Sequence, residues 1–293
     1  MKKKNIIIAV LVVCSLLIAG SGGYLVFKAI NDKQSDDSYK NLASSYVHMT
    51  DPSGMSQENA YTADATSGTG VTYAASSAAP STVPATTVVP YLPAEQNPVD
   101  FQEIQDVEND EIYSWIKVPN TAVDYPVLQS KTSDFFYLDH GVNKQYSFAG
   151  AIYSQFCNKT DYSDRVTVLY GHNMNNGSMF ATLLNFSDPD FFASNKDIYI
   201  YTDNMGYSYE IVSAYYSDTA HIMNSHDFSN DDVYKSFLED VLHPHSISGN
   251  VRDGATLDIN DRLLILSTCS NSGAERFLVV GKLVAQQPLE NAG

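Results

Sequence analysis

The sequence predicts a mainly β domain, an antiparallel barrel or sandwich, in the second two-thirds of the chain. Two observations predict it. Apolar runs of strand length follow one another between polar turns, and few helical patterns separate them, which argues against an α/β sheet. The runs lie at Trp115–Val118, Ala122–Leu128, Val166–Tyr170, Asp197–Tyr201, Tyr207–Tyr216, Arg262–Thr268 and Arg276–Val284.

Composition limits the number of domains and the classes of partner. The chain has 293 residues, of which 44% are hydrophobic, and this is enough for one domain of roughly 150–200 residues with its own core. Its net charge of −17 argues against nucleic acid as a partner. The three cysteines, Cys14, Cys157 and Cys269, match no zinc-ligand spacing and cannot all pair, so at least one thiol is free.

The chain begins with the pattern of a membrane anchor. Lysines within residues 1–4 precede an uncharged stretch, residues 5–27, which is long enough to cross a bilayer. The lysines predict that residues 1–4 stay in the cytoplasm and that the rest of the chain lies outside the cell, held by a single pass. A cleaved signal peptide is the alternative, because small residues occur at 19–23, but the apolar run resumes after them at Tyr24.

The next segment, residues 28–97, predicts a flexible extracellular stalk. Between Tyr61 and Asn97, 23 of 37 residues are Ser, Thr, Ala or Pro, and this composition lacks the periodic apolar residues that a core needs. We therefore expect the segment to hold a domain away from the membrane. That domain is predicted to span residues 98–286, followed by a short tail at 287–293.

Two helices are expected within the domain. Apolar residues recur at near-helical spacing from Phe101 to Val107, and again over about residues 230–242. Ser229 or Asn230 can cap the second helix, and Pro244 stops it. The second helix therefore lies before the apolar run that ends in Cys269.

Three residues at the ends of predicted strands have the chemistry of thiol acyl transfer. Cys269 ends one apolar run, Arg276 opens the next after a six-residue turn, and His172 follows a third run and a glycine. A cysteine can act as a nucleophile, a histidine can carry protons, and a guanidinium can stabilise an oxyanion. On position alone, Cys269 could equally be an inert core thiol.

At these three sites the sequence resembles the sortases, specifically class B. The matching segments are Leu266-Ser-Thr-Cys269, Tyr170-Gly-His172-Asn-Met and Arg276-Phe-Leu-Val-Val, and the likeness extends over most of residues 98–286. The resemblance implies an eight-stranded β-barrel with an N-terminal helix and a helix inserted before the cysteine strand.

The resemblance also implies a reaction. Cys269 would attack the carbonyl after a threonine in a C-terminal sorting motif of the Asn-Pro-x-Thr or Pro-x-Thr-Gly kind. Arg276 would stabilise the oxyanion and His172 would act as general acid and base. A thioacyl-enzyme would then pass the surface protein to an amine of a peptidoglycan precursor or of the cell wall in a Gram-positive bacterium. This chemistry requires no metal or organic cofactor.

Leu138, Ser267 and Thr268 are the candidate substrate-binding residues, by the same resemblance. An alternative function is a pilus-assembling transpeptidase. A cell-wall cysteine peptidase of the papain kind is disfavoured, because His172 precedes Cys269 and no helix follows the cysteine. A non-catalytic surface adhesin is the last alternative, and it predicts an unreactive Cys269.

Overall fold

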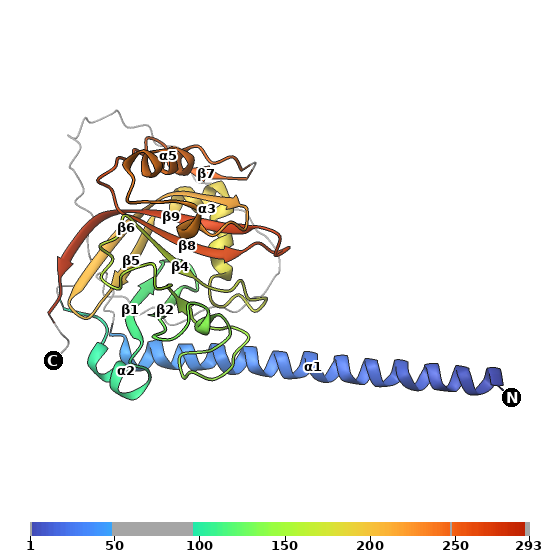
Figure 1. The fold of residues 1–293 in the computed structure, drawn as a ribbon. Coiled ribbons are helices and arrows are strands. Elements are labelled where there is room, and N and C mark those ends of the chain that lie inside the picture. The colour runs from blue at the N-terminus through green and yellow to red at the C-terminus, as the bar shows by residue number, and fades with distance from the viewer. Residues whose placement is uncertain (1, 49–95, 247, 291–293) are drawn as a thin grey trace, which may run out of the picture.

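The structure is a computed structural model that describes residues 2–48, 96–246 and 248–290, with the side chains of residues 2–22 and 25 left out. A β-barrel forms the body of the molecule, and a long helix, α1 (Lys2–Tyr46), runs along one side of it and extends beyond it (Figure 1). The predicted tail at 291–293 and most of the predicted stalk, residues 49–95, lie outside the described residues.

Eight strands close the barrel in the order β5-β1-β2-β3-β4-β8-β9-β6, and β6 pairs back onto β5. A ninth strand, β7, is added to β6 outside the closed ring. The prediction of a mainly β barrel is therefore confirmed. The barrel is not wholly antiparallel, because β2 pairs with β3, and β4 with β8, in parallel. The strands are β1 (Ile112–Lys117), β2 (Asp124–Leu128), β3 (Ile152–Tyr153), β4 (Val166–Tyr170), β5 (Asp197–Tyr201), β6 (Met205–Ser217), β7 (Asn250–Val251), β8 (Leu263–Cys269) and β9 (Arg276–Pro288).

Short helices lie before the first strand and in the connections between strands. Both predicted helices are present: α2 precedes the first strand and α5 lies before the cysteine strand. Asn230 caps α5, since its side-chain oxygen accepts hydrogen bonds from the backbone N–H groups of Asp232 and Val233. The elements outside the strands are α2 (Phe101–Val107), the 3₁₀ turns η1 (Phe136–Leu138) and η2 (Ala181–Ser187), α3 (Pro189–Ser194), α4 (Ile222–Ser225) and α5 (Asp231–Leu242).

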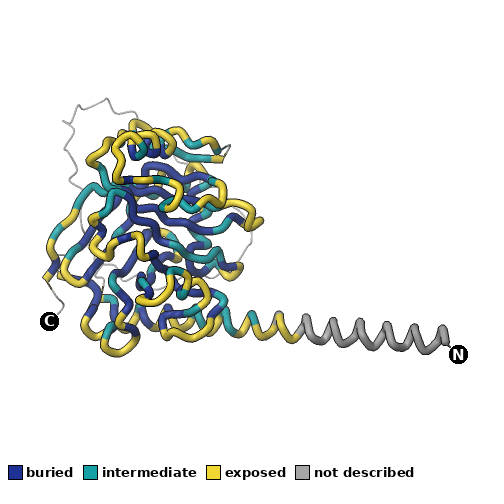
Figure 2. Tube along the Cα trace, viewed as in Figure 1, coloured by how far each residue is buried: buried dark blue, intermediate teal, exposed yellow. Residues whose placement is uncertain are grey.

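The strand that carries the cysteine is buried on both faces. Successive side chains of a strand point to opposite faces, so Leu264 and Leu266 join the core inside the barrel, while Leu263 and Ile265 join a second core under α5. Figure 2 shows buried residues along the barrel strands and exposed ones in the connecting loops. This double burial explains why residues 263–266 are continuously apolar.

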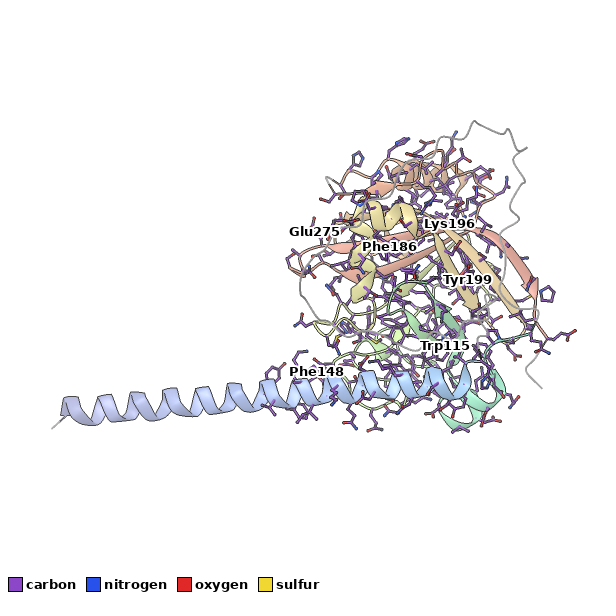
Figure 3. All side chains as sticks on the ribbon, turned by 180° about the vertical axis from the view of Figure 1, so that it is seen from behind. Trp115, Phe148, Phe186, Lys196, Tyr199 and Glu275 are labelled. Atoms are coloured by element: carbon purple, nitrogen blue, oxygen red, sulfur yellow. The ribbon has the colours of Figure 1, made fainter. Side chains whose placement is uncertain are left out.

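The structure differs from the predicted stalk at its beginning. α1 continues to Tyr46, and Tyr39, Leu42 and Tyr46 are buried in the main core, because they recur every three or four residues on one face of the helix. Nearer the N-terminus of α1, the rings of Tyr24 and Phe27 contact Phe148, which lies beside the helix in Figure 3.

The residues that flank the low-complexity segment, residues 49–95, lie side by side. Val47 forms an antiparallel bridge with Val99, and the backbone N–H of His48 donates to the carbonyl of Pro98 at 2.6 Å. The described residues on either side of the segment are therefore in direct contact, and α1 packs against the barrel instead of standing apart from it. Across the part of the chain that the structure describes, no helix is both long and apolar enough for a membrane span.

Candidate active site

Cys269 and Arg276 face each other at the end of one strand pair. Cys269 is the last residue of β8 and Arg276 the first of β9, and the two are register partners. The turn between them is closed by a hydrogen bond from the backbone N–H of Ser270 to the carbonyl of Glu275. This register brings the guanidinium to the sulfur: Arg276 Nη1 donates to Cys269 Sγ at 2.8 Å.

The parallel pairing of β4 and β8 brings His172 to the same end of the barrel. Tyr170 is the register partner of Ser267, so the carboxyl ends of both strands meet. Two hydrogen bonds tie the chain after β4 to the cysteine strand. Gly171 N–H donates to the carbonyl of Ser267 at 3.2 Å, and Asn173 Nδ2 donates to the carbonyl of Cys269 at 3.2 Å.

Gly171 is required before the histidine because there is no space for a side chain. A Cβ atom built there would lie 2.5 Å from Cδ1 of Ile152 and 2.8 Å from the ring of Phe180. The Gly-His pair therefore passes close over the barrel core. The backbone N–H of Phe180 also donates to the carbonyl of His172 at 2.9 Å.

One nitrogen of His172 is held by the backbone. Nε2 donates to the carbonyl of Leu138, the last residue of η1, at 2.7 Å. A hydrogen bond on one ring nitrogen sets the tautomer and leaves the other nitrogen for proton transfer. Among the described residues Nδ1 has no hydrogen-bond partner, so Nδ1 is the nitrogen available as acid or base.

All six residues singled out in the sequence line one cavity of about 190 Å³. Leu138 is partly exposed there, whereas Ser267 and Thr268 are buried. Sequence reasoning missed the rest of the lining. Tyr170 could have been found from its place directly before Gly171, but the others carry no comparable signal. The missed lining residues are Phe135, Tyr153, Gln155, Tyr170, residues 217–222 and Leu278.

Two residues of the cavity lining carry buried hydroxyl groups. Tyr170 Oη and Thr268 Oγ1 are buried and have no hydrogen-bond partner among the described residues. Burial raises the pKa of Tyr170 and raises the pKa of Tyr153 to about 12, so both phenols stay neutral into the alkaline range. Within the described residues, the hydroxyls of Tyr170 and Thr268 therefore keep unused hydrogen-bonding capacity next to the cavity.

His221 is a further missed residue of this cavity. Its Nε2 donates to Oε1 of Gln155 at 2.6 Å, and its Nδ1 accepts from the backbone N–H of Asn224 at 3.2 Å. Both ring nitrogens are therefore engaged. In contrast to His172, His221 has no free nitrogen for proton transfer.

The other described cysteine lies outside the cavity. Cys157 is exposed, and desolvation, followed by the nearby charge of Asp134, raises the pKa of its thiol. Cys14 lies outside the residues whose side chains are described. Over the described residues, no group of three or more His, Cys, Asp or Glu side chains is placed to hold a metal ion.

Comparisons with known proteins agree on one family. A model of the sortase domain matches residues 116–284. The chain is 30% identical to the sortase B of Listeria monocytogenes over 189 residues, which are 63% of this chain and 75% of that protein. It is also 30% identical to the sortase B of Staphylococcus aureus over 188 residues, 63% of this chain and 74% of that protein.

Solved structures show the same likeness. The X-ray structure of Clostridium perfringens sortase B matches with a TM-score of 0.56 and 35% identity, over 63% of this chain and 99% of that one. A Staphylococcus aureus sortase B–substrate complex matches with a TM-score of 0.56 and 28% identity, over 63% of this chain and 84% of that one.

Proposed function

Because this chain belongs to the sortase family of cysteine transpeptidases, and within it to class B, we propose that it cleaves a sorting motif after threonine and joins the surface protein to a cell-wall amine. The observation that carries the proposal is the meeting of Cys269, Arg276 and His172 at one cavity, with Arg276 Nη1 2.8 Å from Sγ. Cys269 is the nucleophile of this proposal.

In the first half-reaction, the thiol proton passes to His172 and the sulfur attacks the threonine carbonyl carbon. The carbonyl oxygen becomes an oxyanion, and Arg276 stabilises it. A guanidinium has five N–H donors in a fixed plane, so it can contact the sulfur and the developing oxyanion together. The C–N bond then breaks, the protonated His172 gives its proton to the leaving amine, and a thioester remains on Cys269.

In the second half-reaction, an incoming amine attacks the thioester carbon. His172 takes the amine proton, the C–S bond breaks, and an amide and the free cysteine are formed. We assign both proton transfers to Nδ1, since Nε2 is bonded to the carbonyl of Leu138. The scheme balances without a metal or cofactor.

The cavity walls suit a short peptide. Leu138 offers an apolar contact, and Ser267 and Thr268 lie directly before the nucleophile, where Thr268 Oγ1 lacks a partner among the described residues. We propose a motif of the Asn-Pro-x-Thr or Pro-x-Thr-Gly kind. The related structures that support a peptide substrate and an amine acceptor are the Staphylococcus aureus sortase B–substrate complex and a sortase B complexed with triglycine.

We also propose that residues 5–27 anchor the enzyme in the membrane, with residues 1–4 in the cytoplasm and the barrel outside the cell. The support is the uncharged sequence of residues 5–27 after the lysine cluster. This orientation places Cys269 on the side of the membrane where surface proteins and cell-wall amines meet.

Peptide cleavage tests the proposal. The full chain is incubated with a panel of sorting-motif peptides, with and without triglycine, and the initial rates of cleavage and of transfer are measured. Cys269→Ala should abolish both rates. Cys157→Ala is the matched control and should leave both rates near the parental values, because Cys157 lies outside the cavity. Equal cleavage by Cys269→Ala and the parent would overturn the mechanism.

A further inference from the structure

We propose that Tyr39 of α1 is a positioning residue for His172, so that the docked N-terminal helix holds the active-site histidine in its working tautomer and orientation. The proposal rests on the proposed role of His172. Tyr39 is 3% exposed, and it reaches the histidine through two separate sets of contacts. Of the residues on these two routes, Leu138 alone is a candidate site residue from the sequence.

The first route passes through Gly150. The hydroxyl of Tyr39 donates to the carbonyl of Gly150 at 2.7 Å, and the bond is buried. Gly150 has a φ of 57°, and a Cβ atom there would lie 2.6 Å from the carbonyl oxygen of Leu138. That oxygen is the acceptor for His172 Nε2. A shift of Gly150 therefore displaces the group that holds the histidine ring.

The second route passes through Tyr125. The rings of Tyr39 and Tyr125 pack edge to face with centroids 5.4 Å apart, and the hydroxyl of Tyr125 accepts from the backbone N–H of Met179 at 2.9 Å. Met179 forms a bridge with Asn173, the residue after His172, and has a φ of 56°. Tyr39 thus supports the backbone of the histidine loop as well as the partner of the histidine ring.

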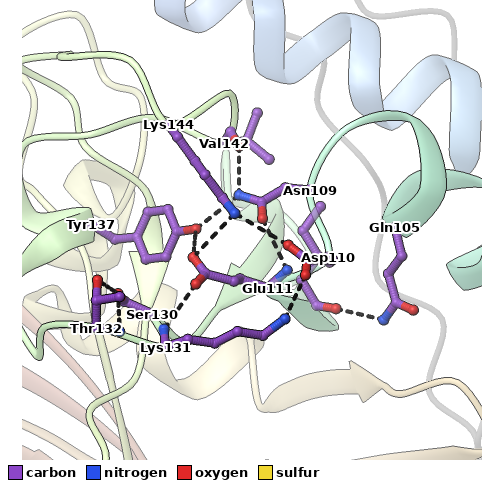
Figure 4. Close-up of polar contacts among 11 residues, drawn as sticks. Gln105, Asn109, Asp110, Glu111, Ser130, Lys131, Thr132, Tyr137, Val142 and Lys144 are labelled. Atoms are coloured by element: carbon purple, nitrogen blue, oxygen red, sulfur yellow. Dashed lines mark hydrogen bonds and ion pairs between the residues drawn. The ribbon is translucent and has the colours of Figure 1, made fainter.

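The turn η1, which ends in Leu138, is also held by hydrogen bonds of Tyr137. The hydroxyl of Tyr137, the central residue of η1, donates to a carboxylate oxygen of Glu111 and accepts from Asn109 Nδ2 at 2.8 Å (Figure 4). The other oxygen of Glu111 accepts from the backbone N–H of Lys131 at 2.9 Å. With its Tyr137 side fixed, η1 responds to a change at Tyr39 mainly through the carbonyl of Leu138.

Tyr39→Phe in the full chain tests the proposal, since it keeps the ring contact with Tyr125 and removes the hydrogen bond to Gly150. A single neutral hydrogen bond predicts a fall in kcat/KM of about threefold to about tenfold, mostly in kcat. The ¹⁵N signals of the His172 ring, assigned with His172→Ala, should move as the population of the Nε2–H tautomer falls.

Tyr46→Phe is the matched control. Tyr46 lies on the same helix, is also buried, and donates to Oε1 of Glu108 at 3.2 Å, away from the histidine. It should lower the thermal midpoint about as much as Tyr39→Phe and leave the His172 signals unchanged. Unchanged His172 signals and kcat in Tyr39→Phe, or equal changes in both variants, would overturn the proposal.

The two proposals fail in different ways. If Cys269→Ala cleaves as fast as the parent, the proposed function fails, while the His172 signals still report on Tyr39. If the parent cleaves, Cys269→Ala does not, and Tyr39→Phe matches the parent in rate and spectrum, only the role of Tyr39 fails.

Discussion

At the scale of single residues, the proposed mechanism depends on Arg276 to stabilise the oxyanion. Its guanidinium contacts Sγ of Cys269 at 2.8 Å, and it lines the cavity where the oxyanion would form. A lysine at this position would keep the charge but lose the planar set of donors. The geometry of the donors, and not the charge alone, is therefore expected to decide the rate.

Substitution of Arg276 measures that contribution. Arg276→Ala should lower kcat roughly 10²- to 10³-fold, as loss of an oxyanion donor does in other enzymes, and Arg276→Lys should recover only part of the loss. Arg262→Ala is the matched control. Arg262 precedes the opposite end of β8 and donates to the carbonyl of Tyr162, so its loss should affect stability more than kcat. A parental kcat in Arg276→Ala would contradict the assignment.

At the scale of elements, strands with long or continuous apolar runs were predictable. The run before Cys269 is buried on both faces, so its signal does not depend on alternation. By contrast, β3 has two residues and β7 has two, which is too short for any pattern. The parallel pairing of β2 with β3 was therefore not predictable, although it helps to place the turn that carries Leu138.

The site residues at strand ends were predictable from the sequence. The contacts between two irregular loops were not. Cys269, Arg276 and His172 lie at or just beyond strand ends, so the topology brings them together. The bond from His172 to Leu138 joins residues 34 apart through an irregular loop, and no local pattern encodes it. Leu138 is a candidate substrate-binding residue from the sequence, whereas the structure shows its carbonyl in contact with the histidine.

At the scale of the whole molecule, the second half of α1 packs against the barrel. α5 and α1 lie on opposite sides of the barrel (Figure 1), and Tyr39 and Leu42 are buried in the main core. The structure departs from the predicted stalk over residues 28–46, where these few core residues are spread along a mostly polar sequence. If residues 5–27 anchor the enzyme, contacts along α1 set the position of the barrel relative to the anchor.

Shortening the low-complexity segment tests this arrangement. Its ends are joined by the bridge between Val47 and Val99, so replacing residues 53–92 with a short Gly-Ser linker should leave peptide cleavage at the parental rate. The unfolding midpoint of the full chain should not fall, because a shorter loop costs less entropy to close. A large loss of stability or cleavage would indicate that the segment itself contributes to the catalytic body.

Intact-mass spectrometry of the full chain tests whether Cys269 forms a thioacyl intermediate. With a sorting-motif peptide and no acceptor, the parent should gain the mass of the acyl fragment that ends in threonine, located on Cys269 by peptide mapping. Triglycine should discharge the adduct into an amide product, and Cys157→Ala should behave like the parent. Cleavage of the peptide with no adduct on Cys269, or with the same adduct in Cys269→Ala, would contradict the account.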